Sequence, residues 1–169
     1  MTKKKIIRIV VIAVIGVTVI GASVVLYLFN KPHRDVQSAT VDFTVASSAL
    51  VEEYLTSAEK ANEKYLSDEG NSKILAIKGK VHSISRDLNN QVVLLLKEEG
   101  DKAGVSCTFT AETNEHAKGL HPGKIITVKG VIRSGAGYDE DLELYEDVIV
   151  EKCDLIKGIS KNLFLSPHP

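Results

Sequence analysis

The chain has 169 residues, a length typical of a single domain and short for a multidomain enzyme. It carries 21 basic and 22 acidic side chains, which are unevenly distributed. Residues 1–29 hold 4 basic and no acidic side chains, whereas residues 30–169 hold 17 basic and 22 acidic ones. The larger part thus has a net charge of −5 and no tryptophan. This argues against a nucleic-acid-binding domain, because neutralising phosphates requires a positive surface.

Residues 9–29 form an uncharged stretch of 21 residues, most of them Val, Ile and Leu. A helix of that length spans roughly 30 Å, which matches the hydrocarbon core of a bilayer. A cleaved signal peptide is the alternative, but its apolar part is usually about 7–15 residues long and a cleavage site follows closely. Here the stretch is longer and ends in Tyr27-Leu28-Phe29, bulky residues suited to the membrane interface. We therefore expect an uncleaved, single transmembrane helix.

The basic residues around this stretch predict its orientation. Lys3, Lys4, Lys5 and Arg8 lie in a tail of residues 1–8 that precedes it. Basic residues flanking a membrane helix are retained on the cytoplasmic side. We expect a protein of the cytoplasmic (inner) membrane with a cytoplasmic amino terminus and a periplasmic or extracellular carboxy-terminal domain, so that the membrane is its first predicted partner.

The chain beyond the apolar stretch begins with a predicted linker and a helix. Residues 30–46 show no sustained periodicity and are interpreted as the linker. Residues 47–67 have apolar side chains at offsets of three and four with charged residues between them, which predicts an amphipathic helix. Its apolar stripe needs a partner surface, and the following residues can provide one.

Five strands are predicted next, at residues 74–85, 91–97, 105–110, 124–133 and 142–153, with a short helix at 111–120. Three strands, a helix and two strands is the order of a five-stranded oligonucleotide/oligosaccharide-binding (OB) barrel. The expected fold class is mainly β with helices. An OB-fold domain at 72–157 is preceded by the amphipathic helix and the N-terminal transmembrane helix, and a tail at 158–169 follows. A β-sandwich fragment is the alternative.

The first and fourth predicted strands share the pattern Lys-Gly-x-(Val/Ile)-x-Ser. Gly79 and Gly130 fall in the middle of these strands, at positions whose alternation points inward. Glycine inside a strand usually marks a bend or bulge of the kind that barrel closure needs. The two glycines therefore favour the barrel.

Several segments together resemble a known family. They are residues 59–65, 77–84, 105–109, 123–130 and 151–153, taken in this order and at this spacing. In these segments the chain resembles the tRNA-anticodon-like OB proteins of bacteria, which are small membrane-anchored proteins found especially in Bacteroidetes. The resemblance covers about residues 50–156, and it implies an OB fold and an anchored topology. It implies no catalytic residues, and transferring tRNA binding to this chain would be analogy alone.

The chain has two cysteines, Cys107 and Cys153. The third and fifth strands of an OB barrel are neighbours, so the two side chains can meet, and an exterior compartment permits disulfides. Cys107 also alternates with Val105 and Phe109, which is typical of a buried free thiol. A disulfide and a pair of buried thiols therefore both remain open.

OB proteins bind ligands on their second and third strands and on the loops between strands one and two and strands four and five. The candidate ligand-binding residues at these places are Arg86, Asn89, Ser106, Thr108, Tyr138 and Tyr145. Binders of single-stranded nucleic acids place stacking aromatics and cations on this face, whereas this chain offers mainly hydroxyls and carboxylates. The candidate ligands are an envelope protein and a saccharide, with Tyr138 as the candidate stacking residue, and an ordinary loop tyrosine without a ligand is the alternative.

Metal, cofactor and catalytic sites are not predicted. Asp139, Asp141 and Glu143 alternate in a way that can hold calcium, but the calcium-loop pattern is absent and a solvated acidic turn is expected. The sequence contains no GxSxG, phosphate-loop or GxGxxG motif. The predicted function is a non-catalytic binding or interaction module of the envelope. A cytoplasmic nucleic-acid-binding protein and an envelope enzyme of unrecognised type are the alternatives.

Overall fold

The computed structural model describes residues 16–26, 35–67 and 72–156. The chain divides into two units, Met1–Arg34 and Asp35–Pro169. In the first unit, residues 16–26 are helical. Across the described ranges no helix combines the length and the apolar character needed to cross a membrane. The predicted basic tail, the ends of the predicted span and the predicted tail at 158–169 lie outside the described residues.

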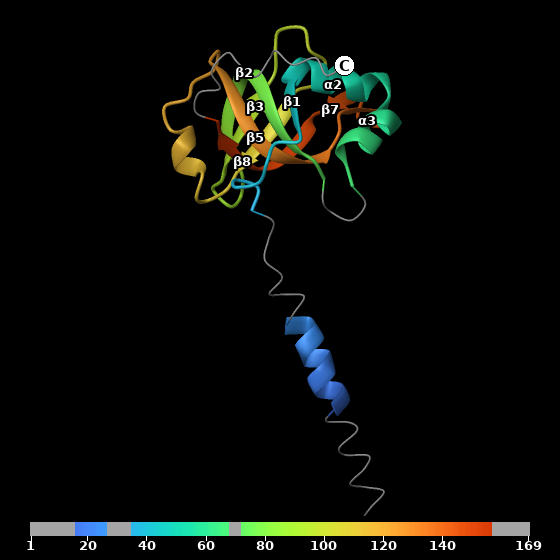
Figure 1. Cartoon of the computed structure of the whole chain (residues 1–169). Helices are drawn as coiled ribbons and strands as arrows, with labels where there is room; N and C mark the ends of the chain where they lie inside the picture. Colours follow the sequence, from blue (N-terminus) through green and yellow to red (C-terminus); the bar gives the residue numbers. More distant parts are fainter. Residues whose placement is uncertain (1–15, 27–34, 68–71, 157–169) are drawn as a thin grey trace, which may run out of the picture. The chain divides into compact units, whose positions relative to one another are not determined.

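The second unit is built around a closed barrel of five strands (Figure 1). These are β2 (Ile74–Arg86), β3 (Val92–Leu96), β4 (Val105–Phe109), β5 (Ile125–Ser134) and β8 (Val148–Leu155). Their order is β2-β3-β4-β8-β5, and β5 pairs with β2 to close the barrel. The β4–β8 pair is parallel and the other barrel pairs are antiparallel. This arrangement is that of an OB fold, and the predicted five-stranded barrel is confirmed.

The barrel interior is filled by alternate residues of each strand. Along β4, Val105, Cys107 and Phe109 are buried while the residues between them are half-buried. Gly79 and Gly130 face inward as predicted, and close packing explains why they carry no side chain. A Cβ at Gly79 would lie 2.5 Å from Ser47 Oγ, and one at Gly130 would lie 2.6 Å from a Val150 methyl carbon. The two glycines therefore let a helix and a neighbouring strand approach the barrel wall closely.

Part of the predicted linker is a strand. β1 (Phe43–Ala46) pairs in parallel with the first half of β2. Asp42, directly before β1, holds the start of β1 against the start of β2, since its Oδ2 accepts a hydrogen bond from the backbone N–H of Ile74 at 2.7 Å. The linker prediction was wrong for residues 43–46, because a strand of four residues is too short to show a period in sequence.

The single predicted amphipathic helix is two helices, α2 (Ser47–Thr56) and α3 (Ala58–Tyr65). Ser57 between them is extended, with φ −157° and ψ 92°. Thr56 and Ser57 are weak helix formers, because a β-branched side chain loses rotamer freedom and a serine hydroxyl competes for backbone hydrogen bonds. The break lets both helices bury apolar side chains in the barrel core, namely Leu50, Val51 and Tyr54 from α2 and Ala61 and Tyr65 from α3.

The connections between the barrel strands differ from prediction in two places. The predicted helix at 111–120 is a short 3-10 helix, η1 (Asn114–Ala117), flanked by turns. The predicted strand at 142–153 is divided into β7 (Leu144–Glu146) and β8, and β7 forms a hairpin with β6 (Gly137–Asp139). In the view of Figure 1, η1 lies to the left of the barrel, and α2 and α3 lie to the right. The hairpin follows β5, so it extends the loop between the fourth and fifth barrel strands.

Candidate functional site: a tyrosine-lined cavity at the β6–β7 hairpin

The β6–β7 hairpin pairs two tyrosines directly. Tyr138 and Tyr145 are opposite each other in the register, and their ring centroids are 4.9 Å apart at an interplanar angle of 52°. The ammonium group of Lys102, from the loop between β3 and β4, lies 5.3 Å from the Tyr145 ring centroid. This distance is within the range of a cation–π interaction. Two loops that are distant in sequence thus build one aromatic surface.

This aromatic surface forms one wall of a cavity of about 400 Å³, and α2 and α3 form the other wall. The lining residues are Tyr54, Leu55, Ala58, Lys102, Ala136, Gly137, Tyr138 and Tyr145. Ligand cavities in proteins are commonly about 300–1,000 Å³ and mostly apolar, with a few polar groups that orient the ligand. The tyrosine-lined cavity matches this description in both size and composition.

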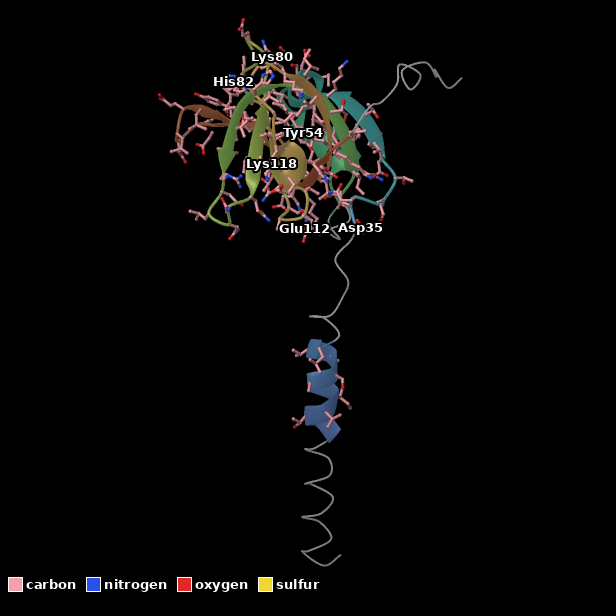
Figure 2. All side chains as sticks on the ribbon, turned by 90° about the vertical axis from the view of Figure 1, so that its left-hand side faces the viewer. Asp35, Tyr54, Lys80, His82, Glu112 and Lys118 are labelled. Atoms are coloured by element: carbon pink, nitrogen blue, oxygen red, sulfur yellow. The ribbon has the colours of Figure 1, made fainter. Side chains whose placement is uncertain are left out.

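Tyr54 is the most buried polar side chain of the lining. It is 2% exposed, and its ring packs so closely over Gly135 that a Cβ there would overlap it. Among the described residues, the Tyr54 hydroxyl is the buried side-chain polar atom without a hydrogen-bond partner. Leaving such a group unsatisfied costs roughly 1–3 kcal/mol. In Figure 2, Tyr54 lies within the packed side chains of the unit, whereas Lys80 and His82 lie at its edge.

Burial also changes the acidity of Tyr54. Desolvation, followed by the nearby Tyr65 and Glu53, raises the pKa of Tyr54 to about 12. Burial disfavours the charged phenolate, and a neighbouring carboxylate disfavours it further. Tyr54 is therefore a neutral phenol at physiological pH, able to donate and accept one hydrogen bond without carrying charge.

The neighbouring Tyr65 is buried too, but its hydroxyl is satisfied. It donates a hydrogen bond of 2.9 Å to Glu53 Oε2, and Lys64 Nζ reaches the same oxygen at 2.8 Å. Glu53 and Lys64 also line a groove of about 420 Å³ between α2 and α3. The same groove is lined by the exposed side chains of Glu52 and Lys60, so it presents a surface of mixed charge, without the aromatic wall of the tyrosine-lined cavity.

The hairpin beside the cavity is strongly acidic. Residues 135–147 contain no basic residue and 6 carboxylates, which are Asp139, Glu140, Asp141, Glu143, Glu146 and Asp147. Two of these carboxylates bind backbone amides. Asp139 Oδ1 accepts a hydrogen bond from the backbone N–H of Asp141 at 2.9 Å, and Asp147 Oδ1 accepts one from the backbone N–H of Gly104 at 2.6 Å. The other four are exposed. Within the described ranges, no three His, Cys, Asp or Glu side chains are grouped so as to hold a metal ion.

The structure brings together only part of the candidate ligand-binding residues. Tyr138 and Tyr145 line the cavity, whereas Arg86 and Asn89 lie at the other end of the barrel, where the Arg86 guanidinium donates to the backbone oxygen of Asn90. Ser106 and Thr108 are half-buried on β4. β4 begins opposite Val148, next to the acidic hairpin, and ends beside the β2–β3 turn. Ser106 and Thr108 therefore lie between the end of the barrel at the acidic hairpin and the end at the β2–β3 turn.

Sequence reasoning found Tyr138 and Tyr145 but not the other six residues that line the cavity, of which Ala136 and Gly137 directly precede Tyr138. Tyr54 and Leu55 belong to the amphipathic pattern of α2, Ala58 begins α3, and Lys102 lies in a polar loop. The aromatic character of Tyr54 is visible in the sequence, but its position on the helix equally predicts an ordinary core residue. Only the path of the hairpin shows which side chains face the cavity.

The two cysteines lie on adjacent parallel strands, as the predicted topology required. Both are free and buried in the structure, which corresponds to the thiol alternative. Burial raises the pKa of the Cys153 thiol well above its usual value, and the neighbouring Cys107 raises it further. A buried thiol whose pKa is raised in this way is a poor nucleophile, because the thiolate is the reactive form.

The model of the tRNA_anti-like family matches residues 1–144. The chain belongs to this family. Membership in the tRNA_anti-like family confirms the resemblance inferred from the sequence, and it agrees with the closed barrel of the second unit. No match was found among curated protein sequences.

The solved structures that are similar to this tRNA_anti-like chain include the following three. A candidate nucleic acid-binding lipoprotein from Klebsiella pneumoniae shares 17% identity with a TM-score of 0.49, over 75% of this chain and 100% of that one. Asparaginyl-tRNA synthetase from Pyrococcus horikoshii shares 24% identity with a TM-score of 0.33, over 53% of this chain and 21% of the synthetase. Its complex with asparaginyl-adenylate gives 23% identity and a TM-score of 0.33, over 54% and 20% of the two chains.

Proposed function

We propose that the protein is a non-catalytic OB-fold binding module of the cell envelope, anchored in the cytoplasmic membrane by a single span and displaying its barrel on the outer side. The observation that carries the binding role is the tyrosine-lined cavity of about 400 Å³ at the hairpin between β5 and β8. OB folds use this loop for ligands. The proposed site consists of this cavity and the adjoining outer face of β4.

The proposed anchoring rests on the sequence of the first unit. Residues 9–29 carry no charge, and all basic residues of the first 29 positions precede them. A stretch of this length is sufficient to span a bilayer, and its flanking charges favour a cytoplasmic amino terminus. The acidic barrel then lies away from the nucleic acids of the cytoplasm.

Nucleic-acid binding is the main competing function, because the family name refers to tRNA. The electrostatics of the cavity disfavour it. Four exposed carboxylates lie on the hairpin that borders the cavity, and residues 30–169 have a net charge of −5. A polyanion would meet repulsion where OB folds usually provide cations.

Two experiments on the full chain test this proposal. In the first, alkaline phosphatase or a fluorescent protein is fused after Pro169. We expect phosphatase activity and no cytoplasmic fluorescence, because phosphatase matures only outside the cytoplasm. Bright fluorescence with inactive phosphatase would contradict the proposed orientation.

The second experiment tests the binding site in living cells. A photo-crosslinking amino acid is placed at Tyr138 in the cavity, at Thr108 on β4, or at Glu63 on the exposed side of α3 as a control. We expect specific crosslinked products from the first two positions and none from the control. Equal crosslinking from all three positions would show that the cavity face is not a binding site.

A further inference from the structure

Resting on the proposed binding function, we infer that the tyrosine-lined cavity and the acidic β6–β7 hairpin together bind an extended peptide segment of a partner protein that carries alternating basic and aliphatic side chains. The cavity would receive an aliphatic side chain, and the carboxylates of the hairpin would pair with its basic neighbours. The apolar lining of the cavity and the charge of the hairpin each support this ligand class.

The walls of the cavity suit an aliphatic side chain. Leu55, Ala58 and Ala136 supply apolar surface, and the rings of Tyr138 and Tyr145 supply flat aromatic surface. Tyr138 is 51% exposed, so a ligand can cover its free face. The hairpin also exposes Leu142 at 66% and Leu144 at 45%, which extends the apolar surface beyond the cavity. Apolar side chains clustered on one short hairpin are typical of an interaction surface.

The negative charge of the hairpin favours a ligand with positively charged side chains. Glu140, Asp141, Glu143 and Glu146 are exposed, and none of their carboxylates is engaged in a hydrogen bond or an ion pair among the described contacts. Among the described residues that line the cavity, the cation is Lys102, and it lies over the Tyr145 ring. Complementary charge accelerates association and excludes wrong partners. A neutral saccharide can donate hydroxyl hydrogen bonds to these carboxylates but leaves their charge uncompensated, and an acidic peptide would be repelled.

The carboxylates of the hairpin also favour a peptide over a lipid chain. A lipid tail carries no cation that could pair with the four exposed carboxylates, whereas a peptide can place basic side chains on either side of an aliphatic one. The Tyr54 hydroxyl does not enter this choice, because its oxygen is closed to solvent.

Fluorescence anisotropy on the full chain in neutral detergent micelles tests this inference. The probe is the fluorescein-labelled hexapeptide acetyl-Leu-Arg-Leu-Arg-Leu-Arg-amide. Parallel titrations use the same peptide with Glu in place of Arg, labelled chitotriose and labelled oligothymidylate. We expect the Arg peptide alone to bind above the level seen with empty micelles, and salt to weaken its binding.

Matched variants locate the binding. Tyr138→Ala removes an exposed aromatic anchor and should raise the Kd about tenfold, a loss typical of an interface hot spot. Glu140→Gln with Glu143→Gln should raise the Kd several-fold and flatten its salt dependence. The charge-matched control, Glu59→Gln with Glu63→Gln on the exposed side of α3, should leave both unchanged.

Each contrary result overturns the inference. If the hairpin and control pairs weaken the Arg peptide equally, binding depends on net charge and no peptide site exists at the hairpin. If chitotriose, oligothymidylate or the Glu peptide binds instead, or if no probe binds, the ligand class is wrong. The proposed binding function is judged separately by the crosslinking from Tyr138 and Thr108, so the two can fail independently.

Discussion

Tyr54→Phe tests most directly whether the Tyr54 hydroxyl is buried without a hydrogen-bond partner. If it is, the substitution should stabilise the protein. Most core substitutions destabilise. Here the change removes only a hydroxyl that is buried without a hydrogen-bond partner. The aromatic ring stays, so its packing over Gly135 and against the Tyr65 ring, with centroids 6.1 Å apart, is retained.

The expected gain follows from the cost of the unsatisfied group. A buried hydroxyl without a partner costs roughly 1–3 kcal/mol, so Tyr54→Phe should raise the free energy of unfolding by about 1–2 kcal/mol. For a domain of this size, 1 kcal/mol corresponds to a Tm shift of about 4 °C. The matched control is Tyr65→Phe, which deletes the 2.9 Å hydrogen bond to Glu53. It should lower the free energy of unfolding by about 1 kcal/mol, since Lys64 still holds the partly exposed carboxylate.

The assay is thermal and urea unfolding of the full chain in neutral detergent, followed by circular dichroism at pH 7 and in an alkaline series. An unfolded tyrosine releases its proton near pH 10, whereas folded Tyr54 keeps it until about pH 12. The folded state thus binds more protons than the unfolded state in this window, and stability falls as pH rises through it. The Tyr54→Phe variant should lose part of this alkaline decline.

Two results would refute the reasoning. If Tyr54→Phe destabilises the protein as much as Tyr65→Phe does, the Tyr54 hydroxyl has a partner within the protein. If the alkaline decline is the same in wild type and Tyr54→Phe, burial does not hold the proton on Tyr54.

Three further predictions concern the barrel. Gly130→Ala should destabilise by about 1–3 kcal/mol in urea unfolding, because its Cβ would lie 2.6 Å from a β8 valine methyl, whereas Gly137→Ala, whose nearest neighbour is at 3.9 Å, should change stability little. Equal effects would refute the close approach. Cys107 and Cys153 should react with a thiol reagent only after urea unfolding, because both are buried; rapid labelling of the native protein would contradict their burial. Asp42→Ala should cost about 1 kcal/mol and speed hydrogen exchange at the amides of β1, since it removes the bond to the first amide of β2; unchanged exchange would show that the side chain does not hold β1.

Sequence patterns sufficed for the barrel because its strands are regular and long enough to show alternation. The predicted strand at 74–85 is β2 (Ile74–Arg86), and that at 105–110 is β4 (Val105–Phe109). Inward glycines at 79 and 130 follow from the same period of two. The patterns failed where elements are short or interrupted. β1 spans four residues, and Ser57 breaks a helix whose apolar stripe continues across the break.

The candidate site illustrates the same limit. Tyr138 could be singled out because it lies in a loop that OB folds use for ligands. The partnership of Tyr54 with Tyr138 could not, because these residues lie 84 positions apart and their approach depends on how a helix break and a hairpin meet. Hydrogen-bond satisfaction is likewise invisible in sequence, since Tyr54 and Tyr65 are the same residue type in similar helical contexts.

The sequence by itself determined the charge separation between the two parts of the chain, the five barrel strands and their order, because these depend on local composition and on a short period. Tertiary structure alone decided which side chains enclose the cavity, which tyrosine hydroxyl has a partner, and that the two cysteines are free thiols. Each of these depends on distances of a few ångströms between segments far apart in the chain. Packing of the whole unit sets such distances, and no local pattern encodes them.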